Sequence, residues 1–167
     1  SAAAYASARI MGVRGAVIAD ALSTFSGLPH RQEIVRVIGN VRFINDSKAT
    51  NSEATAKALA SYENIFWIVG GQFKENSVDI LSGALSTVRH AYLIGDCQDL
   101  FEEGLNGKVP LTRSGDIETA VHQASQAALT CGEPAEVLLS PACASFDQFA
   151  SFESRGAAFR DLVEALS

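Results

Sequence analysis

The sequence predicts an α/β fold of the Rossmann-like, three-layer kind: a mainly parallel sheet with an antiparallel N-terminal hairpin at its edge and helices on both faces. Two observations predict it. From residue 65 onward, short apolar runs alternate with helix-like segments, the pattern of parallel strands joined by right-handed crossovers. Before them, two β-rich runs flank Gly39-Asn40, a pair suited to a tight hairpin turn.

The first 26 residues are expected to form two alanine-rich helical pieces, at 2–11 and 16–24. They are separated by Gly12 and Gly15, which weaken a helix, and they hold too few large apolar side chains to make a core. The step Gly27-Leu28-Pro29 then ends the helical pattern, because proline restricts the residue before it. We therefore expect a domain boundary at Gly27, with residues 1–26 before it and residues 27–167 after it.

The remaining elements follow in chain order. The hairpin strands are expected at 34–38 and 41–44. The later strand candidates are short, apolar and followed by glycine, serine or proline: 65–69, 90–94, 108–111 and 136–139. The helix candidates between and after them are 52–61, 78–85, 99–104, 117–131 and 152–166. In such sheets, ligands bind beyond the carboxyl ends of the strands, where the loops converge.

Composition excludes several classes of function. The chain has 167 residues, 47% hydrophobic and 19% charged, as in an ordinary soluble globular protein, and no apolar run approaches the about 20 residues of a membrane helix. The formal net charge of -6 argues against a nucleic-acid partner, which selects for a basic surface. The three cysteines lack metal-site spacing, and a reducing cytoplasm fits them best.

Polar chemistry is dense in the loop after the hairpin. Asp46, Lys48 and Thr50 place a carboxylate, an ammonium and a hydroxyl within a few residues, just before an expected helix. A ligand site is one interpretation. The start of a helix, with Asn51 as N-cap and Glu53 in the first turn, is the other.

Two later loops add groups that bind anions. Gly70-Gly71 lets the backbone turn sharply and places Lys74 as a cation for a carboxylate, unless it is a loop lysine in solvent. Ser145 offers a hydroxyl, and Ser151 is a plausible N-cap that leaves the amide of Phe152 unpaired in the first turn. A serine-rich structural turn is the alternative.

Other polar or reactive residues also allow both a functional and a structural interpretation. Arg31 could reach a nucleotide phosphate with bidentate geometry, or it is a solvated charge beside a linker. For His30, Cys143 and Trp67 we favour structural roles. The chain has neither a Gly-x-x-x-x-Gly-Lys-[Ser/Thr] phosphate loop nor a Gly-x-Gly-x-x-Gly fingerprint, so it lacks the usual glycine-rich cradle for a nucleotide.

Separated motifs in a fixed order resemble the carboxy-terminal domain of Mur ligases, most closely the D-glutamate-adding members, over residues 27–167. The matching segments are 27–31, 45–51, 70–74, 139–149 and 152–156. The resemblance implies that D-glutamate is bound by Thr50, Lys74, Ser145 and Phe152. It implies that ATP is bound by Arg31, Asp46 and Lys48. It places no catalytic residue and no metal ligand in this segment, and it implies that ATP and Mg are bound mainly by preceding domains.

The resemblance also implies that residues 1–26 end a central ATP-binding domain, so that the chain begins within that domain. The implied activity joins D-glutamate to UDP-N-acetylmuramoyl-L-alanine through an acyl phosphate, in cytoplasmic peptidoglycan synthesis. The segment alone would be inactive, with no nucleic-acid or membrane partner. Gln72-Phe73 departs from the family pattern, which leaves the placement of Lys74 open. Alternatives are a domain of another Mur-type or folylpolyglutamate-type amide ligase, or a non-enzymatic Rossmann-like binding module.

Overall fold

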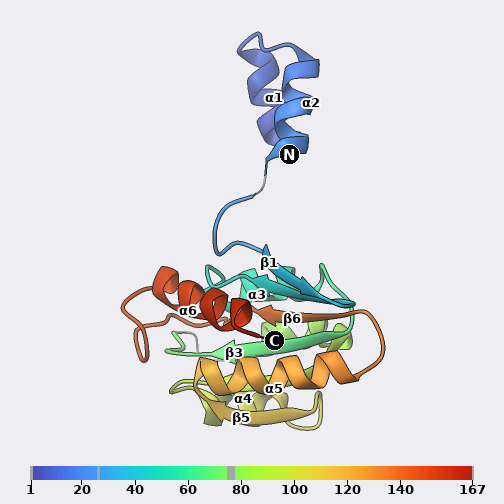
Figure 1. Ribbon diagram of the computed structural model, residues 1–167. Helices are drawn as coiled ribbons and strands as arrows, with labels where there is room; N and C mark the ends of the chain where they lie inside the picture. Colours follow the sequence, from blue (N-terminus) through green and yellow to red (C-terminus); the bar gives the residue numbers. More distant parts are fainter. Residues whose placement is uncertain (1, 26, 75–77, 167) are drawn as a thin grey trace.

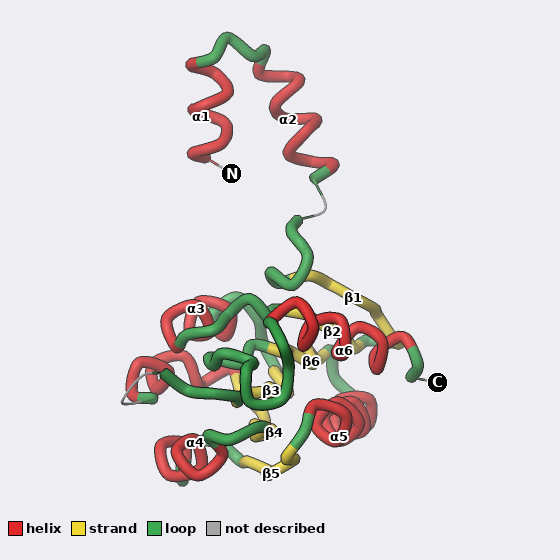
Figure 2. The backbone as a smooth tube through the Cα atoms, turned by 90° about the vertical axis from the view of Figure 1, so that its left-hand side faces the viewer, coloured by secondary structure: helices red, strands yellow, loops and turns green. Residues whose placement is uncertain are grey.

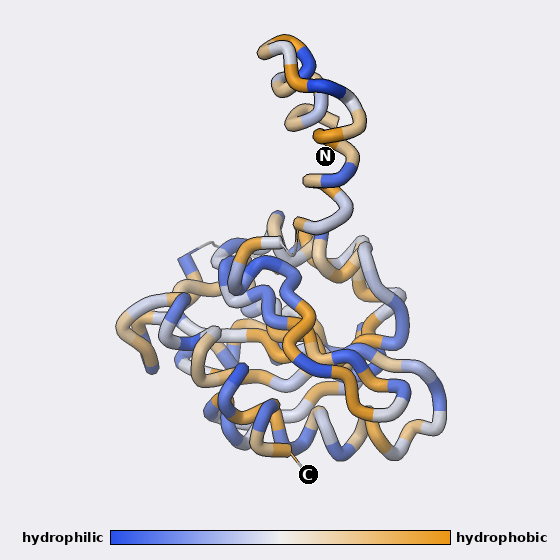
Figure 3. The backbone as a smooth tube through the Cα atoms, turned by 45° about the horizontal axis from the view of Figure 1, so that its top comes forward, coloured by the Kyte–Doolittle hydropathy of each residue, from blue (hydrophilic) through white to orange (hydrophobic). Residues whose placement is uncertain are grey.

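The computed structural model describes residues 2–25, 27–74 and 78–166. It consists of a pair of helices and an α/β unit, joined by the stretch before the first strand (Figure 1). The helices are α1 (Ala2–Ile10) and α2 (Gly15–Thr24). Within them only Ile18 is buried, and Figure 3 shows runs of hydrophobic residues in this pair although it stands away from the sheet. The pair therefore has almost no core of its own.

The α/β unit is built on a mixed six-stranded sheet with the order β1-β2-β6-β3-β4-β5. Strands β1 (Glu33–Ile38) and β2 (Val41–Asn45) form the antiparallel hairpin, and Gly39 at its turn has φ +59°. The other neighbours pair in parallel. Their bounds are β3 (Ile65–Gly70), β4 (Val88–Ile94), β5 (Leu111–Gly115) and β6 (Ala135–Leu139). The predicted fold class is confirmed.

Helices cover both faces of the sheet (Figure 2). One face carries α3 (Ser52–Leu59), the 3₁₀ helix η1 (Asp79–Thr87) and α4 (Gln98–Leu105). The other carries α5 (Ile117–Thr130) and α6 (Phe152–Glu164). Each face of the sheet has its own hydrophobic core. In β3, Trp67 belongs to the core beneath α3, η1 and α4, and Phe66 and Ile68 belong to the core beneath α5 and α6. Successive strand residues point to opposite faces, so a strand with both faces covered is a continuous apolar run.

Two predicted elements differ from the structure. The strand predicted at 108–111 is wrong, because Lys108 lies in a turn whose amide donates to the carbonyl of Leu105. The strand begins instead at Leu111 and runs through polar residues at the sheet edge, where apolar patterning gives no signal. The helix predicted at 78–85 is a 3₁₀ helix, in a segment whose serines and glycine are weak α-helix formers. None of the described helices is long and apolar enough to cross a bilayer.

Candidate functional site

A cavity of about 180 Å³ lies where three loops meet the start of α6. The loops follow β2, β6 and β3, which are neighbours in the sheet. Parallel strands end at one edge, so their loops converge there although they are far apart in sequence. The lining residues are Thr50, Lys74, Ala144, Ser145, Phe146 and Phe152. All four residues predicted to hold the amino acid therefore lie around one cavity.

The Lys74 loop is held against the Ser145 loop by backbone pairing. Gln72 and Ala144 form an antiparallel bridge with N–O distances of 2.9 and 3.0 Å. Gly71 permits this approach, since it has φ +133° and a Cβ atom there would lie 2.4 Å from the carbonyl oxygen of Ala144. Phe73 packs on Phe101, with ring centroids 5.2 Å apart. Gln72 and Phe73 thus anchor the loop from which Lys74 reaches the cavity.

Two groups at the cavity wall suit a carboxylate. Ser145 is 2% exposed, and its hydroxyl has no hydrogen-bond partner among the described residues. The N-terminus of α6 lies beside it, and the predicted N-cap is confirmed, because Ser151 accepts a hydrogen bond from the amide of Ser154. A helix N-terminus carries unpaired N–H groups and favours negative charge. This end of the cavity can therefore bind an anionic oxygen.

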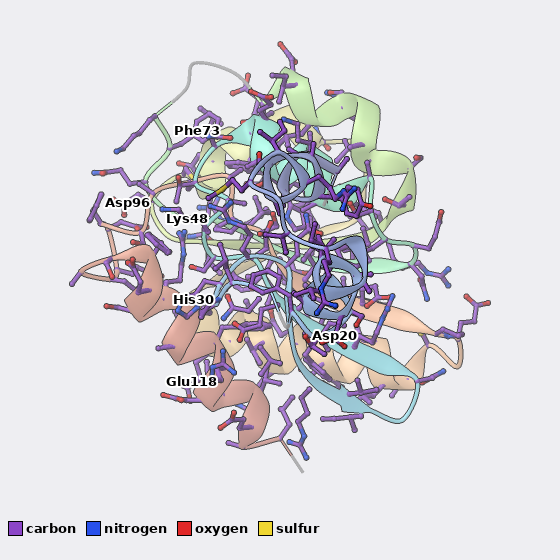
Figure 4. The ribbon with its side chains drawn as sticks, turned by 90° about the horizontal axis from the view of Figure 1, so that it is seen from above. Asp20, His30, Lys48, Phe73, Asp96 and Glu118 are labelled. Atoms are coloured by element: carbon purple, nitrogen blue, oxygen red, sulfur yellow. The ribbon has the colours of Figure 1, made fainter. Side chains whose placement is uncertain are left out.

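One cation, Lys74, lines the cavity, and a second, Lys48, lies close to it. The Lys74 ammonium lies 5.5 Å from the centroid of the Phe146 ring. The Lys48 ammonium lies 3.9 Å from the centroid of the Phe152 ring, which places Lys48 against a residue of the cavity. Figure 4 shows Lys48 between His30 and Phe73 on the side seen from above. Arg31 is exposed and does not line the cavity.

Thr50 lines the cavity just before α3, where Asn51 caps the helix by accepting from the amide of Ala54 at 2.8 Å. The predicted helix start is confirmed, and it coexists with the predicted ligand role of Thr50, because the cap uses Asn51 and leaves Thr50 at the cavity. Among the described residues, no group of three or more histidine, cysteine or acidic side chains is placed to hold a metal ion.

His30 contacts other parts of the protein and holds two segments of the chain together. Its Nδ1 lies 3.0 Å from Nδ2 of Asn45, and its carbonyl accepts from the amide of Lys48. The ring occupies the space beside Gly156, where a Cβ atom would lie 2.2 Å from Nδ1. His30 therefore joins the segment before β1 to α6.

Asp46 does not reach the cavity. It is 5% exposed, and its carboxylate accepts from the amide of Gln32 at 3.1 Å and from the Ser140 hydroxyl at 3.0 Å. Burial raises the pKa of Asp46 from an ordinary 3.8 to about 6, against the opposing effects of these two hydrogen bonds and of the Arg31 charge. The carboxylate therefore ties the segment before β1 to the loop after β6.

The substitution Asp46→Asn should change the pH dependence of stability. Because the folded-state pKa is raised, the folded chain retains a proton that the unfolded chain releases, so stability from Asp46 is present below pH 4 and is lost as pH rises through 6. We expect the free energy of unfolding of the wild type, relative to Asp46→Asn, to fall by about 2 kcal/mol between pH 4 and 7. Urea denaturation of the chain across this range measures it. A pH-independent difference would contradict the raised pKa.

The sequence interpretation missed one residue, Arg155. It is 1% exposed and donates to Ser47 and to the carbonyl of Cys143, both in site loops. A signal was present: Arg155 shares helical spacing with Phe159 and Val163, so it is an arginine on the apolar face of α6. Cys143 is buried, as predicted, with its sulfur 3.4 Å from that of Cys97.

Comparisons with known proteins give close relatives. The chain is 51% identical over 167 residues to the UDP-N-acetylmuramoylalanine--D-glutamate ligase of Phenylobacterium zucineum, covering 100% of this chain and 36% of the relative. It is 52% identical over 168 residues to the enzyme of the same name from Rhodospirillum rubrum, and this match covers 100% of this chain and 35% of that relative. The chain thus spans about a third of the length of these relatives and aligns with their carboxy-terminal part. No protein-family model matches the chain.

Solved structures share the fold. A UDP-N-acetylmuramate-alanine ligase of Thermotoga maritima matches with a TM-score of 0.63 at 14% identity, covering 96% of this chain and 36% of that one. The bifunctional folylpolyglutamate synthase/dihydrofolate synthase of Yersinia pestis matches with a TM-score of 0.51 at 18% identity. This match covers 84% of this chain and 32% of that one. By its likeness in sequence to these relatives, the chain belongs to the Mur ligase family and is similar to its carboxy-terminal part.

Proposed function

We propose that this chain supplies the amino-acid-binding half of an ATP-dependent ligase that joins D-glutamate to UDP-N-acetylmuramoyl-L-alanine in peptidoglycan synthesis. The observation that carries the proposal is the single cavity lined by Thr50, Lys74, Ser145 and Phe152. Relatives about 50% identical over the whole chain bear the name of that ligase. The isolated segment is inactive in this proposal, because the remaining substrates bind to domains that precede it.

The cavity suits an amino acid with two carboxylates. The Lys74 ammonium pairs with the side-chain carboxylate, while the free Ser145 hydroxyl and the Phe152 amide at the N-terminus of α6 hold the α-carboxylate. Thr50 contacts the amino acid from the third loop. With both acidic ends held, the amine is oriented toward the acyl carbon, and this positioning replaces a bimolecular encounter with an intramolecular one.

Arg31 and Lys48 fit the polyphosphate of ATP, because both are exposed cations that could face an opposing domain. When bound, ATP supplies the phosphoryl group that activates the carboxylate of the muramoyl substrate as an acyl phosphate. The ribose contact predicted for Asp46 stays a prediction, and it requires the carboxylate to exchange one of its internal hydrogen bonds. We propose that Mg and most of the nucleotide are bound by the preceding domains.

Residues 1–26 belong, in this proposal, to the end of a central ATP-binding domain, and residues 27–167 form the carboxy-terminal domain. Exposed apolar side chains in and beside α1 and α2 support the division, since a groove of about 420 Å³ there is lined by residues that include Val13, Val17 and Phe25. Closure about Gly27, which has φ +89°, would bring the two sides together and exclude water from the acyl phosphate. The natural location of such an enzyme is the cytoplasm.

The test uses a complete enzyme that contains this chain. We expect ADP formation in the presence of UDP-N-acetylmuramoyl-L-alanine to require D-glutamate, with little activity on L-glutamate, L-alanine or diaminopimelate. The isolated 167-residue chain should form no product under the same conditions. A preference for another amino acid would assign the chain to a different amide ligase. Turnover by the isolated chain would refute the division of the active site between domains.

A further inference from the structure

Arg155 carries a guanidinium inside the α/β unit, beneath the loops of the cavity. Its residue is 1% exposed, and no ion pair among the described residues includes it. Desolvation lowers the pKa of Arg155 to about 10, which leaves it charged at neutral pH. Burying a charge that forms no ion pair is costly, and the Asp147 carboxylate acts on this one only through space, so hydrogen bonds are needed to stabilise the guanidinium.

The hydrogen bonds of Arg155 go to the loops of the site. Its Nε donates to the Ser47 hydroxyl, and its Nη2 donates to the carbonyl oxygens of Ser47 and Cys143, each at 3.0 Å. The Ser47 hydroxyl in turn donates to the carbonyl of Phe152 at 2.8 Å. The remaining nitrogen, Nη1, has no hydrogen-bond partner among the described residues and lies near Gly71, where an added Cβ atom would be 3.2 Å from it.

One side chain therefore hydrogen-bonds to two of the loops that line the cavity and lies close to the third. Ser47 lies in the loop of Thr50, Gly71 in the loop of Lys74 and Cys143 in the loop of Ser145, while Arg155 itself lies in the first turn of α6 after Phe152. A residue that only stabilised the packing of α6 on the sheet would be apolar, as Phe159 and Val163 on the same face are. The planar fork of arginine instead sets distances and angles between its acceptors.

From this geometry we propose that Arg155 is a positioning residue for the amino-acid site, which sets the mutual spacing of the three loops and the start of α6. The inference rests on the proposed function and extends it, because it predicts that Arg155 controls the affinity for a dicarboxylic amino acid without touching it. Its positive charge, which takes part in no ion pair among the described residues, also favours an anionic occupant of the adjacent cavity.

The test is steady-state kinetics of the complete enzyme with Arg155→Lys, which keeps the charge and removes the fork. We expect the KM for D-glutamate to rise roughly 10- to 100-fold, and the KM for ATP to change less than about twofold. Every segment beside the guanidinium lines the amino-acid cavity, whereas only one of them, the loop of Ser47, also carries residues assigned to ATP. Arg160→Lys is the matched control, since Arg160 lies on the same helix and pairs with Glu33 in β1. It should leave both KM values unchanged.

Unchanged KM for D-glutamate in Arg155→Lys would overturn the inference, and so would equal changes in both KM values or a fall in kcat alone. If circular dichroism shows that Arg155→Lys does not fold, Ser47→Ala takes its place, because it removes one acceptor and keeps the arginine. The same selective rise in the KM for D-glutamate is expected. Its absence would refute the positioning role. If the wild-type enzyme forms no ADP in response to D-glutamate, both the proposed function and this inference are refuted. If the wild type is active and the variants behave like it, only the inference is refuted.

Discussion

Replacing Lys74 by alanine in the complete enzyme is expected to lower kcat/KM for D-glutamate roughly 10- to 100-fold, because a hydrogen bond to a charged group contributes about 1.5–3 kcal/mol. The effect should fall on KM for D-glutamate, since the lysine binds a part of the substrate that does not react. KM for ATP should change little. Initial rates of ADP release at varied D-glutamate and varied ATP measure both.

Two further substitutions make this result specific. Arg31→Ala should show the reverse pattern, with ATP affected more than D-glutamate, because Arg31 is exposed and lies outside the cavity. Lys57→Ala should affect neither, since Lys57 pairs with Glu53 on the exposed side of α3. Equal changes in the two KM values of Lys74→Ala would remove Lys74 from the amino-acid site, and unchanged ATP kinetics in Arg31→Ala would remove Arg31 from the nucleotide side.

Trp67→Ala is expected to lower the free energy of unfolding by about 3–5 kcal/mol, more than any other substitution proposed for this chain. Trp67 is fully buried in the centre of the sheet, and its ring packs edge-on against Phe101 with centroids 6.5 Å apart. Its indole nitrogen donates to the carbonyl of Ser140 at 2.7 Å, just where the Ser145 loop begins. The substitution therefore leaves a cavity in the core, and the Ser140 carbonyl beneath the site keeps, among the described residues, only the longer hydrogen bond from the Thr55 hydroxyl, at 3.4 Å.

Urea denaturation of the chain, followed by circular dichroism, measures this change, because Trp67 is the single tryptophan and its fluorescence is lost with it. Trp67→Phe is the control that separates the two contributions. It retains most of the buried apolar surface and loses only the donor to Ser140, so we expect a smaller loss of about 1–3 kcal/mol. A loss below about 1 kcal/mol in Trp67→Ala would contradict the central place of this side chain in the core.

Much of the site was predictable because its signals are local. Asn51 and Ser151 are N-caps in the structure, as the polar residues before each apolar helical pattern predicted. The approach of Lys74 to Ser145 was less predictable, because it depends on the bridge between Gln72 and Ala144, which pairs residues of two different loops. The contacts of Asp46 were not predictable from its motif: its carboxylate accepts hydrogen bonds from Gln32 and Ser140, while its ribose contact stays a prediction.

The sequence by itself determined the class of fold, the hairpin and the loops that carry polar chemistry, because strand length, turn residues and apolar periodicity act between near neighbours in the chain. The tertiary structure alone decided what Arg155 contacts and where the edge strand β5 begins. Arg155 meets Ser47 across 108 residues of sequence, and β5 is specified by pairing with β4 rather than by its own polar side chains. Such contacts depend on how the chain packs, which no local pattern records.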